Sequence, residues 1–140
     1  MTEVEFRVGA ADPQEYACGL LRAAWTKGAR LLVRVAPEQI DAFDLKLWTF
    51  SQPDFLPHCR SGDPLQSRTP IVLTTADDLG AGDVRDCLLN LAPTPLGGWQ
   101  SWPRLIEVVG AEPQARQAAR LRFRLYRDAG CQPSTTEIKP

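Results

Sequence analysis

Five arginines near the C-terminal end are the residues whose types and spacing most clearly indicate a chemical role. Residues 113–130 contain these five arginines and a single acidic residue, Asp128. At about 100° per helical residue, four of them share one arc: Arg116, Arg120, Arg124 and Arg127. Phe123 lies at the edge of this arc. A guanidinium group can bind a carboxylate or a phosphate through two hydrogen bonds, and a neighbouring ring adds an apolar contact. The pattern therefore predicts a site for an acidic ligand.

The alternative interpretation of this segment is a solvated surface helix. No acidic residue is interleaved between the arginines of the arc, so nothing local neutralises it. The opposite side of the helix is predicted to be apolar and to consist of Ala115, Ala118, Ala119, Leu121, Leu125, Tyr126 and Ala129. Arg122 projects into the middle of that apolar side. We expect Arg122 to be paired, with Asp41 or Asp44 as a possible partner, or to reach a groove between elements.

Groups that could perform catalysis are few in this sequence. The single histidine, His58, adjoins Cys59, and such a pair could act as base and nucleophile. Adjacent residues of an extended loop point apart, however, and no second histidine accompanies them. The glycine-containing turns at 9–12 and 80–82 match neither a dinucleotide-binding fingerprint nor a P-loop. One histidine and scattered cysteines also lack the spacing of metal ligands. We therefore expect no catalytic residue, no metal and no cofactor.

The composition indicates one domain with an ordinary core. A chain of 140 residues with 44% hydrophobic content can bury a core without disulfides, and we expect a domain at 1–131 and a polar, loosely held tail at 132–140. The net charge of −1 argues against a general nucleic-acid binder. Neither a leader pattern nor an apolar run of membrane-spanning length is found, and the four cysteines lack C-x-x-C spacing. A reduced, cytoplasmic setting without membrane contact is expected.

Alternating strand and helix patterns predict the α/β class, with helices on both faces of a sheet in a three-layer α/β/α arrangement. Apolar patterns predict strands at 4–9, 31–35, 70–75, 86–92 and 105–109. Proline and glycine signals predict helices at 13–27, 37–48 and 113–130. The first two strands, joined by a helix, imply parallel pairing with a right-handed crossover. The expected fold is Rossmann-like, with a mainly parallel sheet of about five strands and no nucleotide-binding motif.

Large apolar residues gather in the region that follows the second predicted helix. Trp48, Phe55, Leu56 and Pro57 lie at the end of that helix and in the long, proline-containing connection at 49–69. Exposed aromatic residues beside proline are good anchors for a protein partner. In the alternative interpretation, Trp48 and Phe55 close the bottom of the core.

Three segments of the chain resemble one known family. They are FDLKLWTFSQPDFLPH at 43–58, PIVLTT at 70–75 and ARQAARLRFRLYRDAGC at 115–131. Together they resemble the chi subunit of the bacterial DNA polymerase III clamp-loader assembly, which carries an L-W-x6-F-[VL]-P-H block and a closing R-[YF]-[KR]-x-Y-R-x-A-G helix. The resemblance covers most of the chain.

This resemblance implies a non-catalytic bridging protein of DNA replication. Chi-like proteins pair with the psi subunit and bind the acidic C-terminal tail of single-stranded DNA-binding protein, so contact with DNA is only indirect. The implied tail site consists of Arg116, Arg120, Phe123 and Arg124, with Arg127 on the same arc. The implied psi surface consists of Trp48, Phe55, Leu56 and Pro57. Phe123 stands where tyrosine is common in the family, and the short loop before the last helix leaves open which residue near Val109 completes the pocket.

Two other functions are compatible with the residues. The first is a small α/β enzyme that acts on a phosphorylated metabolite at the carboxyl edge of the sheet. The second is direct binding of single-stranded nucleic acid through the arginines and exposed aromatic residues.

Overall fold

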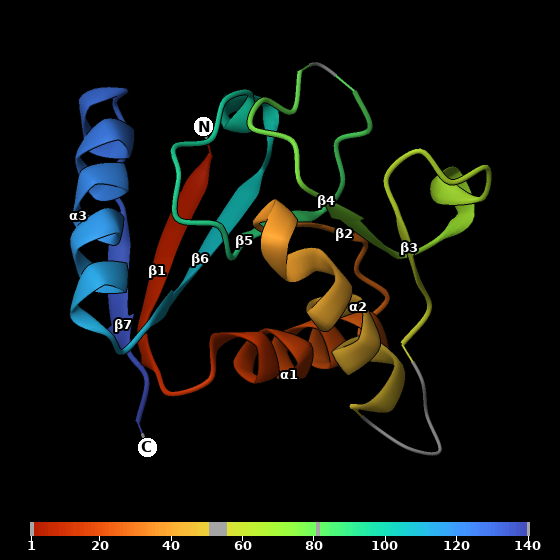
Figure 1. Cartoon of the computed structure of the whole chain (residues 1–140). Coiled ribbons are helices and arrows are strands. Elements are labelled where there is room, and N and C mark those ends of the chain that lie inside the picture. The colour runs from red at the N-terminus through yellow and green to blue at the C-terminus, as the bar shows by residue number, and fades with distance from the viewer. Residues whose placement is uncertain (1, 51–55, 81, 140) are drawn as a thin grey trace.

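In the residues that the computed structural model describes, 2–50, 56–80 and 82–139, the chain forms a seven-stranded parallel sheet (Figure 1). The strand order is β3-β4-β2-β5-β6-β1-β7. The strands are β1 Glu3–Ala10, β2 Leu31–Arg34, β3 His58–Arg60, β4 Ile71–Thr74, β5 Cys87–Asn90, β6 Arg104–Gly110 and β7 Ser134–Glu137. Because all strands are parallel, their carboxyl ends lie at one edge of the sheet.

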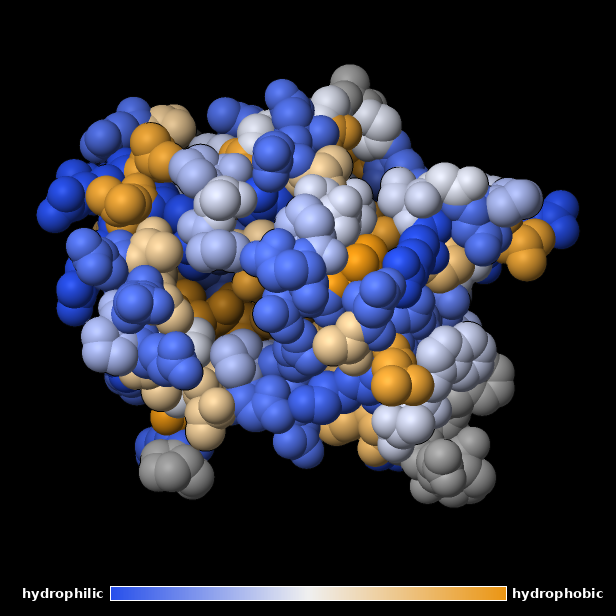
Figure 2. All heavy atoms as spheres, in the orientation of Figure 1, coloured by the Kyte–Doolittle hydropathy of each residue, from blue (hydrophilic) through white to orange (hydrophobic). Residues whose placement is uncertain are grey.

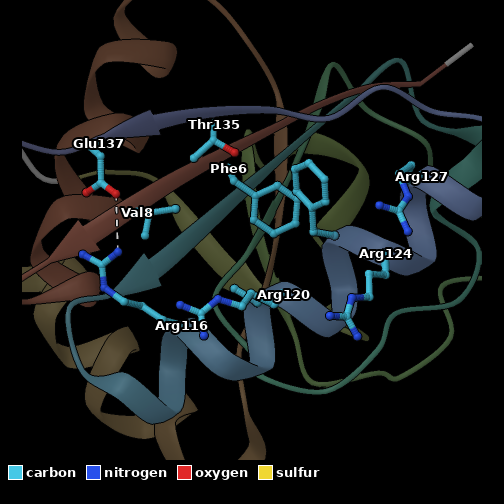
Figure 3. Close-up of a pocket in the computed structure, with 10 residues that line it drawn as sticks. Phe6, Val8, Arg116, Arg120, Arg124, Arg127, Thr135 and Glu137 are labelled. Carbon is cyan, nitrogen blue, oxygen red and sulfur yellow. Dashed lines mark hydrogen bonds and ion pairs between the residues drawn. The ribbon is translucent and has the colours of Figure 1, made fainter.

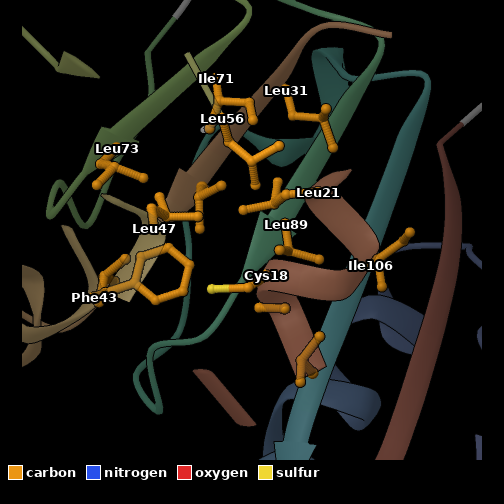
Figure 4. Close-up of a cluster of buried hydrophobic side chains, with 14 of the residues drawn as sticks. Cys18, Leu21, Leu31, Phe43, Leu47, Leu56, Ile71, Leu73, Leu89 and Ile106 are labelled. Carbon is orange, nitrogen blue, oxygen red and sulfur yellow. The ribbon is translucent and has the colours of Figure 1, made fainter. Parts of the chain in front are cut away.

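Helices cover both faces of the sheet, which confirms the predicted three-layer α/β class. The helices α1 (Pro13–Thr26) and α2 (Ile40–Thr49) pack on one face, and Figure 4 shows the apolar cluster that joins them to the strands. The helix α3 (Pro113–Asp128) packs on the other face beside the short 3-10 helix η3 (Trp99–Ser101). Two further 3-10 turns are η1 (Pro37–Gln39) and η2 (Gln66–Arg68). No helix in the described part of the chain is long and apolar enough to span a membrane.

The sequence signals at the helix ends are used as expected. The Asp12 side chain accepts a hydrogen bond from the Glu15 amide at the start of α1, and prolines occupy the first positions of α1 and α3. Gly130 follows α3 with φ of 100°, a left-handed conformation that stops the helix. These local signals explain why the ends of α1 and α3 could be predicted closely.

The predicted number of strands is wrong, because both edge strands were missed. Strand β3 lies within the expected surface connection at 49–69 and pairs with β4. Strand β7 lies within the tail that was expected to be loosely held and pairs with β1. Both are short and polar, and each is ordered by hydrogen bonds to one neighbouring strand. Apolar periodicity does not detect such strands, since β3 has only three residues, two of them polar, and β7 is exposed and polar throughout.

The predicted pairing of the first two strands is also wrong. Strands β1 and β2 are parallel members of the same sheet, but β5 and β6 lie between them. Strand β1 pairs with β6 and β7, whereas β2 pairs with β4 and β5. The apolar pattern of a strand defines its burial but not its neighbours.

Candidate functional site

A pocket of about 300 Å³ lies between α3, β1 and the edge strand β7 (Figure 3). We call it the arginine pocket. It is lined by Phe6, Val8, Arg116, Ala119, Arg120, Phe123, Arg124, Arg127, Thr135 and Glu137. The five residues that the sequence predicted for an acidic-ligand site therefore line one pocket together. Their role in binding remains a prediction.

The inner surface of the arginine pocket is apolar. Phe6 and Val8 project from β1, and the rings of Phe6 and Phe123 lie 5.4 Å apart at an angle of 50°. Phe6 is buried, whereas Phe123 is only partly buried and contributes to the pocket wall. An aromatic or aliphatic group of a ligand would find apolar contacts here, and its transfer from water is worth about 25 cal/mol per Å² of apolar surface that it buries.

The arginines form the polar rim of the same pocket. Arg116 contacts Glu137 at an N–O distance of 3.4 Å, and Arg127 contacts its neighbour Asp128 at 3.7 Å. Within the described residues, neither Arg120 nor Arg124 forms an ion pair, and both are exposed. Figure 3 shows the four arginines spaced along α3, with Phe6 on the facing strand. The rim therefore offers two unpaired guanidinium groups beside an apolar surface.

Five residues of this pocket were not predicted as site residues: Phe6, Val8, Ala119, Thr135 and Glu137. The alternation of Val4, Phe6 and Val8 predicted a strand, but not which helix would cover it. Thr135 and Glu137 belong to β7, and their alternate spacing within a β-branched segment was the available signal for a strand. Val109, near which the pocket was expected to be completed, is buried and does not line it. Val8, which pairs with Val109 across β1 and β6, lines the pocket instead.

The predicted apolar side of α3 is only partly correct. Ala119, Arg122 and Tyr126 are buried against the sheet, whereas Leu121 and Leu125 are 57% and 50% exposed. Figure 2 shows apolar side chains at the surface over α3. The helix is thus rotated relative to the expected orientation, because Arg122 and Tyr126 find polar partners within the core.

Arg122 and Tyr126 share one polar partner in the core, Glu107 of β6. The predicted pairing of Arg122 with Asp41 or Asp44 is wrong. Arg122 Nε and Nη2 each lie 3.2 Å from a carboxylate oxygen of Glu107, and the Tyr126 hydroxyl donates to the same carboxylate. Glu107 is fully buried. Burial, together with the negative charge of Glu107, raises the pKa of Tyr126, so that the phenol stays protonated and donates.

The polar network continues across the sheet through Asn90 and Arg34. Asn90 Nδ2 donates to Glu107 Oε1 at 2.9 Å, and Arg34 Nη1 donates to Asn90 Oδ1 at 3.2 Å. Arg34 also contacts Asp77 at 3.0 Å and donates to the Thr94 carbonyl at 2.8 Å. These bonds tie the ends of β2 and β5 to the loops that follow β4 and β5. The inward polar groups here are satisfied by one another.

The residues predicted for a psi-binding surface differ in their burial. Trp48 is 51% exposed on α2, and its ring lies 4.9 Å from the ring of His58. Pro57 is partly buried. Leu56 is 1% exposed and packs in the core with Phe43 and Leu47 (Figure 4), which weighs against a place on a docking surface. Phe55 lies outside the described residues.

His58 and Cys59 do not face one another. His58 Nδ1 lies 2.6 Å from the Leu56 carbonyl and its Nε2 lies 2.7 Å from Asp44 Oδ1, while Cys59 packs against the cluster on the other face of the sheet. Both ring nitrogens of His58 are thus engaged, Nδ1 with the backbone just before β3 and Nε2 with Asp44 of α2. Among the described residues, no group of three or more His, Cys, Asp or Glu side chains is placed to hold a metal ion.

The Asp44 carboxylate is expected to make part of the stability dependent on acid pH. Burial disfavours its ionisation, but hydrogen bonds from Arg60 and His58 outweigh this effect and hold its pKa below the ordinary 3.8. Such a carboxylate stabilises the fold above its unfolded pKa, and the contribution is lost as the pH falls through its folded pKa. We expect Asp44→Asn to lower the thermal midpoint at pH 7, and the difference from wild type to shrink below pH 3.8. Asp41→Asn, at the exposed end of the same cluster, is the control. Equal midpoints at pH 7 would contradict the prediction.

The fold and the pocket define a class of protein: an α/β domain with a basic, apolar-lined pocket on its surface. The particular family follows from comparison with known sequences. The chain belongs to the family described as DNA polymerase III chi subunit, HolC, whose model matches residues 1–134. It is therefore a chi-type subunit of DNA polymerase III, an accessory subunit and not an enzyme.

Individual relatives agree with this assignment over nearly the whole chain. The DNA polymerase III subunit chi of Pseudomonas aeruginosa is 36% identical over 135 residues, which cover 93% of this chain and 92% of the relative. The corresponding subunit of Haemophilus influenzae is 30% identical over 128 residues, which cover 89% of this chain and 87% of the relative.

A solved structure with a similar fold is the C-terminal domain of the DEAD-box protein Dbp5. The two superpose with a TM-score of 0.60, covering 98% of this chain and 90% of that domain, at 11% sequence identity. At this identity the likeness concerns the fold alone.

Proposed function

We propose that this chain is a non-catalytic adaptor of the cytoplasmic replication machinery, which binds the acidic C-terminal tail of single-stranded DNA-binding protein and pairs with the psi subunit. The observation that carries the proposal is the arginine pocket, in which unpaired guanidinium groups border an apolar surface. A ligand that fits both parts carries carboxylates next to an apolar ring. A peptide tail of aspartates that ends in phenylalanine has this composition.

The proposed arrangement of the tail follows from the positions of the pocket residues. The terminal ring packs against Phe6, Val8 and Phe123, where transfer from water favours an apolar group. Arg120, near the middle of the rim, binds the terminal carboxylate through two hydrogen bonds. Arg124 and Arg127 attract the preceding aspartates, and this part of the interaction weakens with salt.

A direct titration tests this function. A labelled peptide with the sequence of the host tail is titrated with the full chain, beside a peptide that lacks only the terminal phenylalanine. We expect saturable binding of the first, and much weaker binding of the second with much of its salt dependence retained. Equal binding of the two peptides, or an affinity that does not change between low and high salt, would contradict the proposal. A fluorescent oligonucleotide that bound tightly at physiological salt would instead support direct DNA binding.

The psi subunit is proposed to bind the surface around Trp48 on α2. The support is the half-exposed indole beside the exposed Leu45 on the same helix, since large apolar groups at a surface are common anchors of protein interfaces. Phe55 and Pro57 remain part of this proposal. Leu56 is assigned to the core.

Trp48→Ala is expected to weaken binding of psi by about 2 kcal/mol or more, as for an anchor residue, and to leave tail binding unchanged. The two affinities are measured separately by calorimetry with purified psi and with the tail peptide. Leu65→Ala is a suitable control, because Leu65 is also exposed but lies next to η2, away from α2 in sequence. Unchanged psi affinity would assign Trp48 to packing against His58. The same test with Phe55→Ala addresses the other predicted anchor.

A further inference from the structure

The arginine pocket contains a carboxylate of the chain itself. Strand β7 pairs with β1 so that Thr135 lies opposite Phe6 and Glu137 lies opposite Val8. The amide of the next residue, Ile138, donates to the Val8 carbonyl at 2.8 Å, which anchors the backbone at this position. Thr135 and Glu137 are alternate residues of the strand and both line the pocket. The side chain of Glu137 is therefore placed in the pocket by the sheet.

Glu137 forms an ion pair with Arg116 at one end of the pocket. Glu137 Oε1 and Arg116 Nη1 lie 3.4 Å apart, and Figure 3 shows the two side chains meeting there. The pair lies against the bare Cα of Gly9. A Cβ atom at Gly9 would come within 3.2 Å of both Arg116 Nη2 and Glu137 Oε2, and Gly9 has φ of 96°. The backbone of β1 thus leaves room for this ion pair.

The ion pair divides the rim of the pocket into two unequal parts. At the Arg116 end the guanidinium charge is already matched by Glu137. Toward the other end, Arg120 and Arg124 have no such partner among the residues that the structure describes. The family match ends at residue 134, so Glu137 lies beyond the segment that the chain shares with the family model.

We propose that Glu137 competes with acidic ligands for Arg116. It thereby weakens the binding of such ligands at one end of the arginine pocket and confines their carboxylates to Arg120 and Arg124. The inference rests on the proposed function for the identity of the ligand. An acidic peptide must either displace the Glu137 carboxylate or leave Arg116 unused. In both cases a negative charge in the pocket opposes a negative ligand. Because 66% of the Glu137 side chain is exposed, water and salt screen this effect and keep it modest.

The test is a double-mutant cycle on the full chain with the acidic tail peptide. We expect Glu137→Gln to tighten binding about fivefold at low salt, and less at high salt, because the amide keeps the size of the side chain and removes its charge. Arg116→Ala is expected to change the affinity less than threefold in wild type, yet to abolish most of the gain in the Glu137→Gln background. Glu38→Gln is the matched control, since it makes the same charge change on η1, outside the pocket.

A second measurement does not depend on the peptide. In each variant, inorganic sulfate is titrated and the Arg116 side-chain Nε–H signal is followed by NMR. We expect sulfate to shift this signal in Glu137→Gln at concentrations that leave wild type unchanged. Peptide binding by wild type with no gain in Glu137→Gln would overturn the inference and leave the proposed function standing. Absence of peptide binding in every variant would overturn the proposed function, and the sulfate response would then decide whether Glu137 occupies Arg116.

Discussion

Glu107→Ala is expected to lower the free energy of unfolding by about 3–5 kcal/mol, because it leaves the Arg122 charge buried without its partner. The Glu107 side chain is fully buried and accepts from Arg122, Tyr126 and Asn90. Removing the carboxylate would leave three donors, two from α3 and one from β5, without this acceptor. The affected groups belong to α3, β5 and β6, so both the docking of α3 and the sheet beside it would weaken.

Urea unfolding followed by circular dichroism measures this effect. Asp128→Ala serves as the control, because the Asp128 pair with Arg127 on the same helix is exposed and is expected to contribute less than about 1 kcal/mol. Replacing Glu107 and Arg122 together by leucine should cost less than Glu107→Ala alone, since no buried charge is left unpaired. If Glu107→Ala unfolded within 1 kcal/mol of wild type, the buried pair would not hold α3 to the sheet.

Arg120→Ala is expected to weaken binding of the acidic tail by about 2 kcal/mol or more, which corresponds to roughly thirtyfold in affinity. Arg120 lines the arginine pocket and forms no ion pair with the described residues, so its guanidinium group is available to a ligand carboxylate. Arg120→Lys is also expected to be costly, because a lysine ammonium cannot bind both carboxylate oxygens with two parallel hydrogen bonds.

Fluorescence anisotropy with a labelled tail peptide, from low to high salt, separates the contributions of the pocket. Arg124→Ala should weaken binding and flatten its salt dependence, since one screened charge is removed. The matched control is Arg68→Ala, which removes an exposed arginine of η2 outside the pocket. If Arg120→Ala and Arg124→Ala both bound the peptide with wild-type affinity, the arginines would be a solvated surface without a role in binding.

The sequence alone determined the elements whose signals are local. Asp12 and Pro13 begin α1, Pro113 and Gly130 bound α3, and continuous apolar runs mark β2 and β4 as buried strands. The arginine arc could be predicted for the same reason, because its members share one helix and the helical repeat fixes their common side. The family resemblance, carried by segments 43–58 and 115–131, was likewise available from the sequence and is confirmed.

Only the tertiary structure decided which residues from distant parts of the chain come into contact in the pocket and in the core. Phe6 and Glu137 belong to strands at opposite ends of the chain, and they meet in one pocket because β7 pairs with β1. The choice of Glu107 as the partner of Arg122 also depends on which strand lies beneath α3. Leu56 appeared in the sequence as part of an exposed loop, but it fills space between α2 and the sheet. Pairing and packing between distant segments determine these outcomes, and local periodicity records only that a residue is apolar, charged or small.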